Sequence, residues 1–255
     1  MTTCRRRSAV IPLLFWLLSI PAAGNCGADA AEIVRASIDY YRGQASASTV
    51  EMTIHRRAWE RTLTIRGWTK GMKESLFAIT APPKDEGNAT LKRGNEMWTF
   101  NPKVHRTIKI PPSMMSQSWM GSDFSNNDLA KSDSILEDYT HRLAGAESHQ
   151  GKTVFVIESL PRPAAPVVWG KQLLRIREDH ILLAEEFYDE DLRLVKSLTG
   201  SRIEMMGGRL FPTVWRMEKA DAAGEYTQLR YLELSFPEDL PDSLFTLSSL
   251  KTLRR

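Results

Sequence analysis

Short segments in which apolar and polar residues alternate recur along most of the chain. In residues 50–55, Val50, Met52 and Ile54 alternate with polar residues, which is the pattern of a strand with one buried face. The same pattern, or a short apolar run bounded by turn residues, occurs in residues 62–66, 75–80, 88–93, 96–101, 107–110, 137–143, 153–159, 172–177, 181–188, 192–198, 203–206, 211–217 and 226–234. The chain is therefore predicted to be mainly β, with one antiparallel sheet of about a dozen strands.

A sheet of that size does not stay flat, because the twist of successive strands accumulates and curls it. We expect an incomplete half-barrel with one concave face. Helical pattern is confined to a few segments, which would cover that face. Residues 31–42 carry an apolar stripe that ends at Gly43, residues 125–130 offer capping side chains for a short helix, and residues 240–245 form a final helical turn.

Residues 96–130 combine two short strands with an unusually apolar loop. Trp98 and Phe100 fall on one face of the first strand, because side chains alternate along it. Four large apolar side chains follow in the loop: Met114, Met115, Trp119 and Met120. Adaptable Met beside Trp suits a surface that repacks against a variable apolar partner. The alternative is that these residues plug the end of an ordinary core.

The first 30 residues have the composition of a secretory signal peptide. Arg5-Arg6-Arg7 precede an apolar run from Ala9 to Ile20, and Ala28-Asp29-Ala30 fits a cleavage site. The run is shorter than the roughly 20 residues that span a bilayer, although a retained anchor is an alternative. We expect residues 1–30 to be removed on secretion and residues 31–255 to form a single domain.

Cysteine content and charge exclude several classes of site in the mature chain. Both cysteines, Cys4 and Cys26, precede the cleavage site, so no disulfide or cysteine metal site is expected. Lipidation of Cys26 is an alternative. Cleavage removes three of the 34 basic and one of the 31 acidic residues, which leaves a net charge of +1. A nearly neutral chain gives no electrostatic reason to expect nucleic acid as a partner.

The sequence contains no recognisable set of catalytic or metal-binding residues. The five histidines are scattered without metal-binding spacing. Residues 123–128 resemble a calcium loop, but Asp128 stands where such a loop requires glycine. Glu185 and Glu186 fall on opposite faces of a strand and cannot act as a catalytic pair. We expect no cofactor, no metal and no enzymatic activity; hydrolysis of lipids is an alternative for which the sequence offers no nucleophile.

Large aromatic side chains are frequent and often lie in or beside loops. They are Trp59, Trp68, Trp98, Trp119, Trp169 and Trp215, together with Phe100 and Phe124. Each of them singly fits a core. Collectively, beneath a curled sheet with a movable cover, they could line an apolar cavity.

The central block of the sequence resembles the LolA-like family of outer-membrane lipoprotein-sorting proteins. The matching residues are 98–102, 106–111 and 118–129. The likeness extends from the helix at 31–42 to residues 240–245, and is greatest to the branch found with RND-type or ABC-type exporters.

This resemblance implies an incomplete β-barrel that holds acyl chains under a helical lid, in a periplasmic carrier that moves lipid or lipoprotein between membranes. We expect Met114, Met115, Trp119 and Met120 to form the lid, Trp98 and Phe100 to form the floor, and Phe124, Trp68 and Trp169 to complete the site. The expected partners are acyl chains and an inner-membrane exporter, and the protein is expected to be a monomer. An accessory subunit that grips a segment of an exporter is the alternative function.

Overall fold

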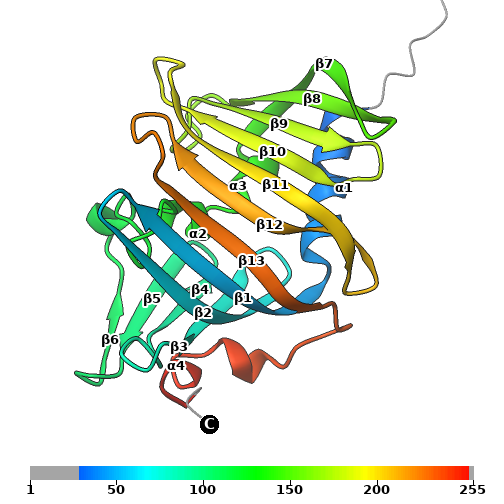
Figure 1. The fold of residues 1–255 in the computed structure, drawn as a ribbon. Coiled ribbons are helices and arrows are strands. Elements are labelled where there is room, and N and C mark those ends of the chain that lie inside the picture. Colours follow the sequence, from blue (N-terminus) through cyan, green and yellow to red (C-terminus); the bar gives the residue numbers. More distant parts are fainter. Residues whose placement is uncertain (1–28, 253–255) are drawn as a thin grey trace, which may run out of the picture.

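One curved antiparallel sheet forms most of the protein (Figure 1). The structure is a computed structural model that describes residues 29–252, so residues 1–28 of the predicted signal peptide, with both cysteines, lie outside the described residues. The thirteen strands are β1 (Ala45–Arg56), β2 (Trp59–Lys70), β3 (Glu74–Ala81), β4 (Ala89–Arg93), β5 (Glu96–Asn101), β6 (Arg106–Lys109), β7 (Tyr139–His149), β8 (Lys152–Pro161), β9 (Lys171–Arg177), β10 (Leu182–Tyr188), β11 (Leu194–Met206), β12 (Arg209–Lys219) and β13 (Tyr226–Ser235).

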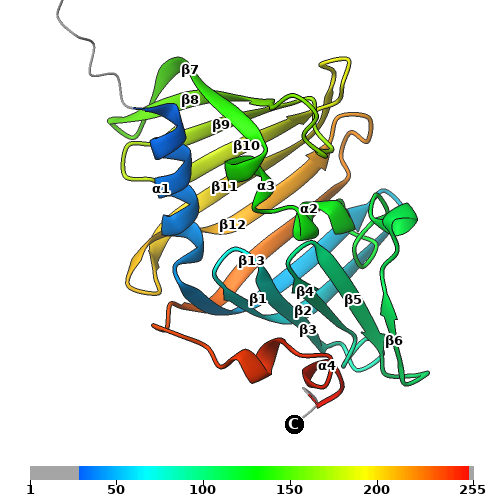
Figure 2. The same ribbon diagram turned by 180° about the vertical axis from the view of Figure 1, so that it is seen from behind.

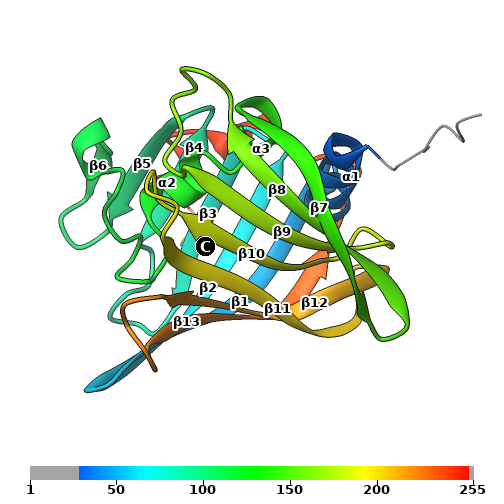
Figure 3. The ribbon, with the colours of Figure 1, turned by 90° about the horizontal axis from the view of Figure 1, so that it is seen from above.

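The sheet is open, with β6 at one edge and β7 at the other. Its order is β6-β5-β4-β3-β2-β1-β13-β12-β11-β10-β9-β8-β7. The pairing of β1 with β13 joins the two halves of the sheet, so that residues at the beginning and end of the domain are neighbours. This arrangement confirms the predicted mainly β class and the incomplete barrel, and Figure 3 shows its curvature from above.

Helices α1, α2 and α3 lie on the inner, concave face of the sheet (Figure 2). Helix α1 (Ala30–Arg42) begins where the Asp29 side chain accepts a hydrogen bond from the Ala31 backbone N–H at 3.0 Å, and it ends at Gly43. Its Val34 packs with Tyr139, Ile157 and Leu174 in one buried cluster. The predicted helix is therefore confirmed, and its apolar stripe meets the half of the sheet around β7–β9.

The chain between the two sheet edges crosses the concave face, and we call residues 111–138 the cover segment. It contains the 3-10 helix η1 (Pro112–Met114), helix α2 (Asn126–Ala130) and helix α3 (Ser134–Glu137). Ser125 caps α2 in a reciprocal capping box with Asp128, as the capping residues predict. Among residues 29–252, no helix is long and apolar enough to cross a membrane.

A second apolar cluster lies on the outer face of the sheet, and we call it the outer-face cluster. Its buried members are Leu76, Ala78, Ala89, Leu91, Phe100, Phe245 and Leu250, with Trp68 and Trp98 packed against them. Phe245 belongs to the 3-10 helix η2 (Asp242–Phe245) and Leu250 to helix α4 (Ser249–Thr252). The C-terminal residues therefore cover the outer face of β3–β5, while the helices α1–α3 cover the inner face.

Two strand boundaries differ from the sequence prediction. Residues 192–198 and 203–206, predicted as separate strands, belong to one long strand, β11. Gly200 lies within this strand and faces the indole of Trp215: a Cβ there would lie 3.1 Å from the ring. The strand predicted to begin at Glu137 begins at Tyr139, because Glu137 closes α3.

Candidate functional site

A cavity of about 370 Å³ lies between the concave face of the sheet and the helices that cover it. Its wall includes residues of α1, the cover segment and strands from both halves of the sheet. The large apolar side chains of the wall include Ile65, Phe77, Leu129, Leu174, Leu182, Leu198, Phe211, Trp215, Met217 and Leu229. A volume of this size and an apolar wall are typical of a small-molecule or lipid-chain site.

Small residues widen the cavity beneath the cover segment. Ser46 and Ser48 of β1, Gly67 of β2 and Ser75 of β3 all face it. They stand on neighbouring strands, with Ser48 paired to Gly67. Their short side chains leave room where longer ones would fill the concave face.

Helix α1 closes one side of the cavity through an aromatic group. The ring of Tyr41 stacks on Phe211 at 5.1 Å and meets Trp215 edge-on at 5.6 Å. The Tyr41 and Tyr231 hydroxyls are 2.7 Å apart and hydrogen-bonded. Burial raises the pKa of both tyrosines, so both hydroxyls remain neutral.

Trp119 attaches the cover segment to the sheet from inside. It is buried, meets Phe77 edge-on at 5.6 Å, and donates its Nε1–H to Thr90 Oγ1 at 3.1 Å. Trp119 and Phe124 both line the cavity. The apolar loop thus covers the concave face, as predicted, through these two aromatic side chains.

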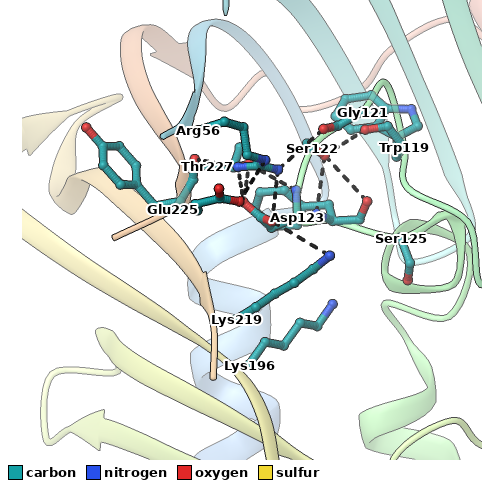
Figure 4. Close-up of polar contacts among 12 residues, drawn as sticks. Arg56, Trp119, Gly121, Ser122, Asp123, Ser125, Lys196, Lys219, Glu225 and Thr227 are labelled. Carbon is teal, nitrogen blue, oxygen red and sulfur yellow. Dashed lines mark hydrogen bonds and ion pairs between the residues drawn. The ribbon is translucent and has the colours of Figure 1, made fainter. Parts of the chain in front are cut away.

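A buried ion pair fixes the loop that precedes α2 to the β1–β13 pair (Figure 4). Arg56, at the end of β1, binds Asp123 through two nitrogens at 3.0 and 3.1 Å. Thr227 of β13 donates to the same carboxylate at 2.7 Å, and Lys219 lies 3.9 Å from it. The Asp123 side chain is only 4% exposed, so its charge depends on these partners.

A second buried pair holds α3 to the opposite part of the sheet. Lys92 of β4 is buried and donates to Asp133 at 3.3 Å, to Ser132 Oγ and to the Met72 carbonyl. Burial is the main effect on its ammonium and lowers its pKa. The cover segment is therefore anchored at two points by desolvated ion pairs, which hold it by specific geometry.

Two carboxylates, Asp128 of α2 and Glu185 of β10, also line the cavity. Lys196 of β11 forms an ion pair with Asp128 and lies over the rings of Trp169 and Phe187, 5.0 and 5.3 Å from their centroids. Burial is the main cause that raises the pKa of Glu185 to about 7; the charge of Asp128 acts in the same direction and that of Lys196 opposes it.

Of the nine predicted ligand-binding residues, the structure places three on the cavity wall. These are Trp119, Phe124 and Trp169. Met114 and Met115 belong to the cover segment, but their side chains are not part of the wall; Met114 is 41% exposed. Met120 packs at the rim with the cluster around Trp119.

The other three predicted residues lie on the wrong face for a cavity floor. Trp68, Trp98 and Phe100 belong to the outer-face cluster. Strand β3 shows how the two faces alternate. Ser75 and Phe77 face the cavity, whereas Leu76 and Ala78 on the same strand face outward. Because the C-terminal residues bury the outer face as well, both faces of these strands are apolar, and the sequence pattern alone could not distinguish inner from outer.

Several residues of the cavity escaped the sequence analysis. Tyr41, Phe211 and Tyr231 read as ordinary core positions, and Asp128 as a helix cap. Glu185 was excluded only as one of a catalytic pair. The strand register places Glu185 opposite Leu174 and Leu198. An acidic residue between apolar cross-strand neighbours was the one available indication that this position belongs to a site.

Comparisons with known proteins agree with this geometry. The family model that matches residues 71–252 is described as an uncharacterized protein, and no curated protein matches the sequence. A DUF1329 family protein from Desulfovibrio piger is 26% identical over 87% of this chain and 97% of its own, with a TM-score of 0.77.

Two further solved structures have the same fold. A LolA superfamily protein from Nitrosomonas europaea is 26% identical over 87% of this chain and 99% of its own, with a TM-score of 0.72. An outer membrane lipoprotein-sorting protein domain from Vibrio parahaemolyticus is 24% identical over 87% of this chain and 98% of its own, with a TM-score of 0.75.

Proposed function

Because the chain belongs to the LolA-like family, we propose that it is a periplasmic, non-enzymatic carrier that shelters the acyl chains of a lipid or lipoprotein and moves them between membranes. The observation that carries this proposal is the apolar cavity of about 370 Å³ beneath an anchored cover segment. Each methylene removed from water contributes about 0.8 kcal/mol. A chain of a dozen methylenes therefore supplies roughly 10 kcal/mol before the cost of binding, which a preformed cavity can realise.

Release of such a ligand requires the cover segment to move. The cavity is bounded on one side by Trp119, Phe124 and Leu129 of this segment, while the sheet supplies the floor. We propose that Trp119, Phe124 and Trp169 contact the acyl chain, and that Met114, Met115 and Met120 form the outer surface and rim of the cover. These methionines would meet a partner or a membrane when the cover opens.

Filling the cavity tests the carrier function directly. We expect Ser48→Trp to reduce uptake of a fluorescent fatty acid at least tenfold, because the indole occupies the space beneath the cover segment. Ala47→Trp is the matched control: it is the preceding residue of β1 and faces outward beside Trp68. Circular dichroism establishes that both variants fold. Equal uptake by Ser48→Trp, Ala47→Trp and the wild type would contradict the use of this cavity.

Bound material from the native source gives a second test. Native mass spectrometry of the protein purified from periplasm is expected to show a lipid or acylated species that organic extraction removes. A protein that is uniformly empty and takes up no fluorescent fatty acid would overturn the proposal. Turnover of an ester substrate would instead support a lipid hydrolase.

The exposed edge strands favour one other function, that of an accessory subunit of an exporter. Strand β7 is eleven residues long, pairs only with β8 among the described strands, and exposes most of its length. An edge of this kind can accept a strand from a partner. A pull-down with the periplasmic domain of the exporter in lipid-free conditions would distinguish this function, because a carrier is expected to need its ligand for handover.

A further inference from the structure

The cavity is apolar over most of its wall, but two carboxylates line it: Asp128 from α2 of the cover segment and Glu185 from β10. Lys196 of the adjacent strand β11 lies beside them and forms an ion pair with Asp128. Lys196 is paired with Phe187 in the strand register, and Phe187 is two residues from Glu185 on the same face. Lys196 and Glu185 are therefore diagonal neighbours on the sheet.

Lys196 is already committed to a partner. Its side chain is 4% exposed, forms an ion pair with Asp128, and lies over two aromatic rings. The two cations that line the wall also have partners: Arg42 donates to the Gly71 carbonyl at 2.8 and 3.1 Å, and Lys131 donates to the Pro166 carbonyl.

Both carboxylates, in contrast, have acceptor positions without donors. Among residues 29–252, no donor hydrogen-bonds Glu185, whose direct cross-strand neighbours are Leu174 and Leu198. The Asp128 side chain is only 10% exposed, and its Oδ1 has no hydrogen-bond partner. A carboxylate in apolar surroundings is costly unless something donates to it.

The charge balance indicates the chemistry of a ligand that fits here. With Glu185 ionised, the local group of Asp128, Glu185 and Lys196 carries one excess negative charge; Arg42 and Lys131 also line the wall, but neither is among the charges that shift the pKa of Glu185. An anionic head such as a phosphate or a carboxylate would meet two like charges and one cation that is already paired. A cationic amine would supply Glu185 with the donor it lacks and neutralise the excess charge.

We propose that this end of the cavity binds the cationic amine of an amphiphile, with Glu185 accepting its N–H and Asp128 adding a second negative charge, while the hydrocarbon chain lies against the apolar wall. This inference rests on the proposed carrier function and adds a specificity for the head group. The raised pKa of Glu185 agrees with it, since a carboxyl group that is half-protonated near neutral pH ionises readily when an ammonium arrives beside it.

The test compares three amphiphiles of equal chain length. Dodecylamine, dodecanol and dodecanoate, each below its micelle concentration, are used to displace a neutral pyrene-labelled ester from the full mature chain. We expect dodecylamine to displace the probe at a concentration about tenfold lower than dodecanol, a difference of about 1.4 kcal/mol, and dodecanoate to be the weakest of the three.

Two variants assign the preference to Glu185. In Glu185→Gln the ratio between dodecylamine and dodecanol is expected to fall to about one. Glu204→Gln, which removes the same charge from an exposed position on β11, is expected to keep the wild-type ratio. Parallel changes in both variants would indicate a general effect of net charge and would overturn the proposal.

The outcomes separate the two levels of the hypothesis. Equal displacement by the amine and the alcohol in the wild type, or preference for dodecanoate, overturns the head-group inference and leaves the carrier function standing. Failure of the ester and of all three amphiphiles to bind overturns the carrier function and this inference with it.

Discussion

Glu185 illustrates how the cavity changes the chemistry of a single residue. Its usual pKa is near 4.5, and burial raises it to about 7. Because the folded state holds the proton more tightly than the unfolded chain, this group stabilises the fold fully only below its unfolded pKa. That stability is lost as the pH rises through the folded value. The stability that Glu185 contributes is therefore lost between about pH 4.5 and pH 7.

We predict that Glu185→Gln removes this pH dependence. The shift corresponds to roughly 3 kcal/mol at most, so the variant should match the wild type near pH 4 and exceed its unfolding free energy by up to that amount above about pH 8. Chemical denaturation at several pH values measures this. Glu204→Gln, on the surface, should follow the wild type throughout. A constant difference between Glu185→Gln and the wild type at all pH values would contradict burial as the cause.

At the scale of elements, the cover segment depends on two ion pairs that connect it to opposite parts of the sheet. Arg56–Asp123 joins the loop before α2 to the β1–β13 pair, and Lys92–Asp133 joins α3 to β4. The segment contains only short helices, and such helices are marginal without tertiary contacts. We therefore infer that these pairs, with Trp119, control whether the cavity is closed.

Loss of the first pair is predicted to loosen the cover segment. Arg56→Leu leaves the Asp123 carboxylate buried without its main partner, which costs roughly 3–5 kcal/mol. Hydrogen exchange should then be faster at the amides of residues 119–128 than in β1, and bound fatty acid should dissociate faster. Arg57→Leu is the control, because Arg57 is the exposed neighbour. The double variant Arg56→Leu with Asp123→Asn should recover part of the unfolding free energy that Arg56→Leu loses. Equal losses in the single and the double variant would assign the effect to packing alone.

At the scale of the whole molecule, the sheet is covered on both faces by segments far apart in the sequence. Helices α1–α3 cover the inner face and enclose the cavity, whereas the C-terminal residues pack tightly against the outer face of β3–β5. The two coverings have different purposes. The inner one leaves space for a ligand, and the outer one buries Phe100 and partly covers Trp98.

The outer covering is predicted to be important for stability. Phe245 is 1% exposed within the outer-face cluster, so Phe245→Ala should lower the unfolding free energy by about 3 to 5 kcal/mol. Leu247→Ala, at a residue that is 44% exposed, should change it by less than about 0.5 kcal/mol. Thermal unfolding of both variants gives the comparison. Unchanged fatty-acid affinity in Phe245→Ala at low temperature is expected, because the cluster is separated from the cavity by the sheet.

The sequence by itself determined the mainly β class, the curled sheet, the opening helix and the capped helix α2, because alternation and capping are local properties. It also predicted nine residues of an apolar site, of which Trp119, Phe124 and Trp169 line the cavity. Only the tertiary structure decided which face of each strand encloses the cavity. Trp68, Trp98 and Phe100 face outward because the distant Phe245 and Leu250 pack on them, and no local pattern records that pairing. Likewise, Asp128, Glu185 and Lys196 come together only when the sheet curves and the cover segment crosses it.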